Sequence, residues 1–175
     1  MKRIVACLLA VCLLVLPSCS GQPKKSAMYP VNGAYNLTPQ EYIDAVNAIV
    51  EKQGDSRYKT IPDFEESGKA ISVWGINIEV KIDTNDAGKI TQIKYEWTIT
   101  SLEVATAATF LVGLTIGMLS SSSDNADTII DQLDMLATGY SSYETSCTMD
   151  GSDYDFFCFG GGKYNWLTIT PATTE

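Results

Sequence analysis

Two turn-forming segments of the chain carry clustered acidic side chains, whose oxygens could coordinate a calcium ion. Segment 83–88 begins like a calcium-binding loop, but Ala87 interrupts its ligand series and Lys94 stands where a bidentate Glu is required. A second group of carboxylates, which could hold calcium only loosely, comprises Asp150, Asp153 and Asp155. We interpret both segments as solvated hairpin turns, and we predict no metal site.

Two serine-containing patterns could supply a catalytic nucleophile. Residues 56–59 read Ser-x-x-Lys and residues 123–125 read Ser-Asp-Asn, and both resemble motifs of penicillin-interacting serine enzymes. The third motif of those enzymes, Lys-Ser/Thr-Gly, is missing, and Ser56 falls in an expected loop instead of at the start of a helix. A cell-envelope serine hydrolase that uses Ser56 is therefore our third hypothesis, and we predict no catalytic residue.

A glycine-rich segment, Gly160 to Lys163, suggests a phosphate-binding loop. The pattern fails on both sides, because Tyr164 follows the lysine where Ser or Thr is needed and Phe157 replaces the first glycine. A turn that joins two strands explains the glycines, and the sequence predicts no cofactor.

Aromatic residues are concentrated near the C-terminus. They are Tyr154, Phe156, Phe157, Phe159, Tyr164 and Trp166. Because neighbouring residues of a strand point to opposite faces, both faces of the predicted hairpin carry rings. One set can fill the core, and the other is either exposed for binding or covered by a helix or the N-terminal segment. We predict a binding surface made of Tyr154, Phe156, Tyr164 and Trp166.

Composition narrows the possible functions. The 175 residues are 45% hydrophobic and 19% charged, which is typical of a globular domain, and the net charge is −9. Such an acidic chain is a poor partner for nucleic acid. The sequence has no histidine, so it lacks the most common general base and the most common neutral metal ligand. These features favour a binding domain over an enzyme.

The N-terminus is typical of a secretory signal peptide. Lys2 and Arg3 precede an apolar run from Ile4 to Leu16, which is too short to span a membrane. The end of this run resembles the lipobox of bacterial lipoproteins, with Ser18 before the cleavage point and Cys19 as the lipidated residue. The alternative is an ordinary secretory signal with a chance cysteine.

The lipobox resemblance implies an extracytoplasmic protein that is bound to a bacterial membrane through an N-terminal lipid. Ser20 differs from the Asp that retains lipoproteins at the inner membrane, so the resemblance implies the outer membrane of a Gram-negative cell. In a Gram-positive cell it implies the cell surface. Loss of Lys2 and Arg3 leaves ten basic residues against twenty-one acidic ones. Because anionic headgroups do not attract such an acidic chain, the lipid must attach the protein to the membrane.

The remaining cysteines predict a disulfide. Cys7 and Cys12 leave with the signal peptide, and Cys19 carries the lipid. Cys147 and Cys158 then form an even pair in a non-reducing compartment. They fall on opposite arms of a predicted hairpin, so we expect a Cys147–Cys158 bond.

Hydrophobic periodicity predicts the elements that position these residues. A helix begins after the Thr38 cap and ends at Gly54, and two further helices span 102–119 and 124–139. The helix at 102–119 is apolar nearly all round, but its Thr, Ala and Gly content favours a buried helix over a membrane span. The predicted strands cover 74–83, 93–99, 141–149, 154–159 and 164–170.

These elements predict an α+β fold with an antiparallel sheet of about five strands and helices on one face, an order that two αββ halves could build. We expect a signal peptide at 1–18, a lipidated cysteine and tether at 19–37, and one domain at 38–171. The first hypothesis for function is a non-catalytic, lipid-anchored interaction domain, whose partner could be an envelope or secreted protein. A carrier of a small apolar ligand or lipid is the alternative.

Overall fold

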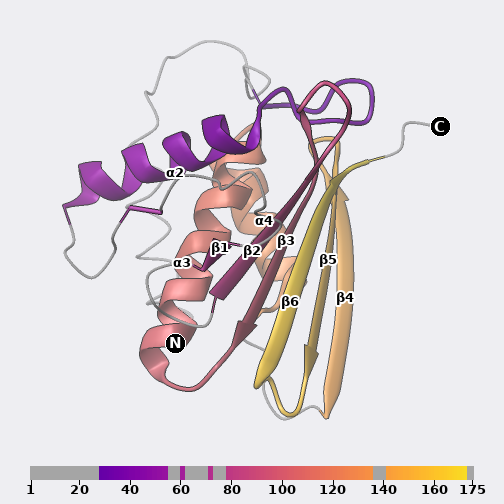
Figure 1. The fold of residues 1–175 in the computed structure, drawn as a ribbon. Helices are drawn as coiled ribbons and strands as arrows, with labels where there is room; N and C mark the ends of the chain where they lie inside the picture. Colours follow the sequence, from indigo (N-terminus) through magenta and orange to yellow (C-terminus); the bar gives the residue numbers. More distant parts are fainter. Residues whose placement is uncertain (1–27, 55–59, 62–70, 73–77, 136–140, 173–175) are drawn as a thin grey trace.

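One antiparallel sheet and a layer of helices make up the computed structural model, which describes residues 28–54, 60–61, 71–72, 78–135 and 141–172 (Figure 1). The strand order is β1-β2-β3-β6-β5-β4, and every neighbouring pair is antiparallel. The strands are β1 (Ile71–Ser72), β2 (Ile78–Thr84), β3 (Ile90–Thr98), β4 (Ser142–Met149), β5 (Ser152–Phe159) and β6 (Tyr164–Pro171). The predicted α+β class is confirmed.

Three helices pack on one face of the sheet, and no described element covers the other face, which we call the open face (Figure 1). They are α2 (Pro39–Gln53), α3 (Leu102–Leu119) and α4 (Ser123–Leu133). The chain runs from α2 through β1–β3, then from α3 and α4 through β4–β6, and the two halves meet where β3 pairs with β6. The predicted division into two halves is therefore present, with a second helix in the C-terminal half.

Helix α2 forms where the capping signals predict it. The Thr38 side chain accepts a hydrogen bond from the Glu41 backbone, and the Glu41 carboxylate accepts one from the Thr38 backbone. Gly54 ends the helix in the left-handed conformation at φ 65°, which glycine adopts without steric cost. These contacts lower the pKa of Glu41, because its charged form accepts the Thr38 bonds and lies beside Lys89.

Helix α3 is the centre of the core. Within the described residues it is the one helix that is long and apolar enough to cross a membrane, and most of it is buried inside the protein. Its Thr115 lies in a buried hydroxyl cluster that joins three elements. Tyr42 of α2 and Tyr95 of β3 bond to each other and to Thr115, with Thr115 Oγ1 at 2.9 Å from the Tyr42 oxygen and 2.5 Å from that of Tyr95. Burial raises the pKa of both tyrosines, so the cluster stays neutral.

The folded domain begins earlier than the predicted boundary at residue 38. Tyr35 is fully buried, and its backbone N–H donates to the carbonyl of Ile90, whose own N–H donates to Leu37. The Tyr35 hydroxyl reaches across the molecule to donate to Ser152 at 3.1 Å. Assigning residues up to 37 to a tether was therefore wrong, because residues 34–37 supply core side chains and pair with the start of β3.

The predicted Cys147–Cys158 disulfide is absent, and this is a correction. Both cysteines are free thiols. Cys147 lies opposite Tyr154, whereas Cys158 lies opposite Tyr143. The two thiols are thus four ladder positions apart, or about 13 Å along the strands, well beyond the reach of a disulfide. The sequence placed them on facing arms correctly but could not give the register.

The thiols can be counted directly in the purified protein. Burial raises the pKa of Cys147 and of Cys158, so little thiolate is present at neutral pH. We expect slow alkylation of the native protein by iodoacetamide, and full alkylation of both cysteines after unfolding without a reductant. Peptide mass mapping reads the result. If Cys147 and Cys158 can be labelled only after reduction, the free-thiol assignment is wrong.

A carboxylate ties the α3–α4 turn to the β4–β5 turn. Asp150 accepts hydrogen bonds from the backbone and hydroxyl of Ser121, both at 2.8 Å, and from the Asn125 amide at 3.0 Å. Burial of Asp150 opposes its ionisation, but the bonds from Ser121 and Asn125 outweigh burial and hold its pKa below the usual value. The acidic turn that could have held calcium is thus partly used as a structural clamp.

We expect Asp150→Ala to lower the free energy of unfolding by about 1–3 kcal/mol near neutral pH, because the donors of Ser121 and Asn125 lose their acceptor. The loss should be complete above the ordinary carboxyl pKa and should shrink as the pH falls through the lowered pKa of Asp150, where the native carboxylate becomes protonated. Urea unfolding at several pH values measures it. Asp86→Ala, in an exposed turn, is the control and should change stability by less than about 0.5 kcal/mol. An equal or pH-independent loss in both variants would contradict the clamp.

Candidate functional site

The open face of the sheet carries the side chains that alternate with the core residues. On β5, Ser152, Tyr154, Phe156 and Cys158 point into the core, so the intervening residues point outward. The outward side chains of the long strands include many charged ones: Glu79, Lys81, Asp83, Lys94, Glu96, Glu144, Asp153 and Asp155. A wet, charged face is the usual solvent side of an antiparallel sheet.

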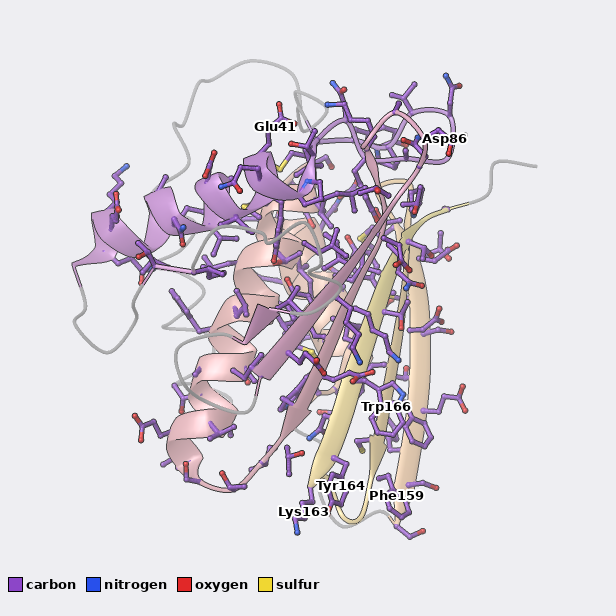
Figure 2. All side chains as sticks on the ribbon, viewed as in Figure 1. Glu41, Asp86, Phe159, Lys163, Tyr164 and Trp166 are labelled. Carbon is purple, nitrogen blue, oxygen red and sulfur yellow. The ribbon has the colours of Figure 1, made fainter. Side chains whose placement is uncertain are left out.

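Four rings interrupt this polar face at one end of the sheet, and we call them the aromatic surface: Phe157, Phe159, Tyr164 and Trp166. Phe157 and Trp166 are opposite each other on β5 and β6, with ring centroids 4.7 Å apart. Phe159 and Tyr164 form the next pair at 6.1 Å, and these two are among the exposed large hydrophobic residues, at 53% and 40%. Figure 2 shows Phe159, Tyr164 and Trp166 together at this end.

The glycine-rich segment is the turn beside these rings, which confirms its interpretation as a strand connection. Gly160, Gly161 and Gly162 have φ values of 66°, 72° and 86°, a run of left-handed residues that only glycine adopts readily. Asn165 donates to the carbonyl of Gly162 at 2.9 Å and fixes the turn. Lys163 places its ammonium 5.2 Å from the centroid of the Tyr164 ring, so this lysine packs on an aromatic face.

Half of the predicted binding surface is corrected by the structure. Tyr164 and Trp166 lie on the open face, but Tyr154 and Phe156 are 0% and 1% exposed and belong to the core. Phe156 packs against Trp97 of β3, with centroids 6.0 Å apart. The exposed rings of β5 are instead those of Phe157 and Phe159.

A signal in the sequence could have found the correct face. Phe157 and Phe159 share their strand parity with Asp153 and Asp155, and charged residues mark the solvent side of a half-buried strand. The aromatic residues alone could not decide, because both parities contain two. Cys158, which is a small buried residue here, shares the parity of Tyr154 and Phe156.

The two sides of the aromatic surface differ in charge. On the β3 side, Glu96 lies opposite Trp166 and is paired with Lys81 at 2.6 Å and Lys94 at 2.8 Å. These two bonds lower the pKa of Glu96. On the β4 side, Glu144 lies opposite Phe157 and has no cation beside it among the described residues. The rings therefore lie between Glu96, whose charge is balanced by two lysines, and Glu144, which has no ion-pair partner among the described residues.

The other sequence motifs do not form a reactive centre within the described residues. Ser123 and Asn125 lie in the first turn of α4, and Asn125 is held by Asp150. Ser56 lies outside the described residues. Segment 83–88 is the β2–β3 turn, organised by Asn85, which accepts bonds from the backbones of Ala87 and Lys89. No group of three or more His, Cys, Asp or Glu suited to a metal ion occurs in the part of the chain that was described.

Comparisons with known proteins do not assign a family to this fold and surface. Protein-family models, curated proteins and solved structures give no match to the chain. The geometry of the open sheet face must therefore carry the functional argument.

The two ring sets of β5 can be separated by stability measurements. We expect Phe156→Ala to lower the free energy of unfolding by about 3–5 kcal/mol, because it opens a cavity in a packed core. Phe159→Ala removes an exposed ring and should cost at most about 1 kcal/mol. Urea unfolding of the two variants checks this, and a larger loss at Phe159 than at Phe156 would reverse the assignment of faces.

Proposed function

We propose that this protein is a non-catalytic, lipid-anchored interaction domain outside the cytoplasm, and that its aromatic surface binds another protein. The observation that carries the proposal is the pairing of four rings on the uncovered face of the sheet, two of them strongly exposed. Exposed aromatic groups are costly to keep in water and are enriched where proteins bind partners. Tyr and Trp in particular supply much of the binding energy at interfaces.

The position of the N-terminal segment supports this arrangement. The rings of Tyr29 and Pro30 lie directly on Gly151, so the chain enters the domain at the β4–β5 turn. Strand β5 runs from that turn to Phe159, a length of about 25 Å. The end of the sheet where Tyr29 and Pro30 lie is therefore opposite to the end that carries the aromatic surface (Figures 1 and 2).

This geometry fits a lipid at Cys19. Eight residues lie between Cys19 and Met28, so the two are at most about 30 Å apart along the chain. A domain connected through its β4–β5 end can extend the opposite end, with Phe159 and Trp166, about one strand length beyond its point of attachment. The rings are then available to a partner that is not embedded in the membrane.

The two other hypotheses have less support. A carrier needs an apolar pocket between the sheet and α3. Leu111 and Ile116 are fully buried there, and the polar hydroxyl cluster of Tyr42, Tyr95 and Thr115 occupies the same layer. A hydrolase needs a base and an oriented nucleophile. The sequence has no histidine, and the Ser-Asp-Asn motif forms the start of α4.

Site-specific photo-crosslinking in living cells tests the proposal. A photoreactive phenylalanine analogue is introduced at position 159 of the full chain, in the cells that naturally produce it. We expect discrete protein adducts from position 159, and we expect Trp166→Ala in the same chain to abolish them, because Trp166 belongs to the same ring group.

The matched control carries the analogue at position 102, since Leu102 is 79% exposed but lies on α3 at the start of the helix layer. The same adducts from positions 102 and 159 would indicate random collision. Adducts at 159 that survive the loss of Trp166, or no adducts at either position, would refute the aromatic surface as a binding site.

A further inference from the structure

We infer that the aromatic surface binds a basic protein segment, one that places Arg or Lys side chains over the rings and against Glu144. This inference rests on the proposed function and names the chemistry of the partner. It is carried by the charges that surround the rings and by the contact that one ring already makes with a cation.

The β4 side of the rings is acidic. No Lys or Arg occurs between Lys94 and Lys163 in the sequence. In the structure this stretch supplies α4 and the β4–β5 hairpin, which together carry eight carboxylates: Asp124, Asp127, Asp131, Asp134, Glu144, Asp150, Asp153 and Asp155. A partner with the opposite charge is attracted by this field, and an acidic partner is repelled.

Two of these carboxylates lie on the open face next to the rings. Glu144 is directly opposite Phe157, and Asp155 precedes Phe157 by two residues on the same face. Neither has an ion-pair partner among the described residues, in contrast to Glu96 with its two lysines. They are positioned to receive the cations of a partner.

Crowding of like charges extends to the adjacent helix. Burial raises the pKa of Asp127, and the nearby charges of Asp131 and Asp124 raise it further. Helix α4 packs on β4 from the helix-covered face of the sheet, so its carboxylates lie behind the strand that carries Glu144. They add to the negative field at this edge of the sheet.

The rings themselves suit a cation. The ammonium of Lys163 lies over the Tyr164 ring at 5.2 Å, which shows that this end of the face accepts a positive charge on an aromatic plane. Among the described residues no lysine lies over the Phe157–Trp166 pair, which is next to Glu144. An arginine that stacks on Trp166 or Phe157 can therefore form a charge-assisted hydrogen bond to Glu144 at the same time.

Peptide binding to the full chain tests the inference. The probe is a short fluorescent peptide of alternating Arg and Ser, and its partner is the same peptide with citrulline, a neutral isostere, in place of Arg. Fluorescence anisotropy measures both. We expect the Arg peptide to bind at least about tenfold more tightly than the citrulline peptide, and more weakly as salt is raised.

Matched variants locate the site. The double variant Glu144→Lys, Asp155→Lys should lower the affinity for the Arg peptide by about tenfold or more. The control Glu51→Lys, Asp86→Lys makes the same change in net charge away from the rings. It should have less than about a third of that effect on a logarithmic scale. Trp166→Ala should weaken binding by about three- to tenfold, and Leu102→Ala should not. Circular dichroism verifies that each variant is folded.

The outcomes separate this inference from the proposed function. Equal binding of the Arg and citrulline peptides, or equal losses in the two charge-reversal pairs, would overturn the basic partner. If the Arg peptide fails to bind while the Trp166-dependent adducts at position 159 persist, the interaction domain stands and its partner is not basic. A calcium titration is the last control. Displacement of the peptide only at millimolar calcium is charge screening and agrees with a basic partner. Calcium binding at micromolar concentration would assign the carboxylates to a metal and overturn the inference.

Discussion

The antiparallel pairing of β3 with β6 is the constraint on which the rest of the structure depends. It is the contact that joins the sheet of the N-terminal half to that of the C-terminal half, through a register that runs from Ile93 opposite Ile169 to Thr98 opposite Tyr164. This register sets Tyr95 and Leu167 side by side beneath the helices, where the Tyr95 hydroxyl meets Thr115 of α3. The same register places Glu96 opposite Trp166 on the open face. The core and the surface are thus positioned by one ladder.

A shift of that ladder by one residue would exchange its two faces. Side chains on a strand alternate with a period of two, so a slip would carry Trp166 into the core and expose Leu167 to water. The core resists such a slip because the inward side chains of β6, Leu167 and Ile169, are fully buried and would lose that burial. The aromatic surface is therefore held in place by the buried residues that alternate with it along β5 and β6. The rings also pack in cross-strand pairs, Phe157 with Trp166 and Phe159 with Tyr164.

The sequence predicted what depends on neighbouring residues and missed what depends on distant ones. The capping box of α2, the buried nature of α3 and the strand–turn–strand order all follow from local periodicity and caps, and they are confirmed. The register of β4 against β5 is not local, so the facing but distant Cys147 and Cys158 were wrongly joined. Tyr35 reads as part of a linker because its partner, Ser152, lies at the other end of the chain. Phe157 and Phe159 were missed for a different reason. Only their shared strand parity with Asp153 and Asp155 marks them as outward-facing.

The acidity of the C-terminal half and the exposure of its rings have a common physical explanation. A group of exposed rings beside β4, an edge strand without Lys or Pro, would invite association between copies of the chain. Glu144 and Asp155 lie beside the rings, and the aspartates of α4 add negative charge behind the same edge of the sheet, so two copies that approach along this edge repel each other. Burial and the nearby charges of Asp131 and Asp124 raise the pKa of Asp127, and a partner with the opposite charge is attracted where a second copy is repelled. On this view the carboxylates keep the aromatic surface soluble and select what binds to it, because one electrostatic field rejects like surfaces and attracts basic ones.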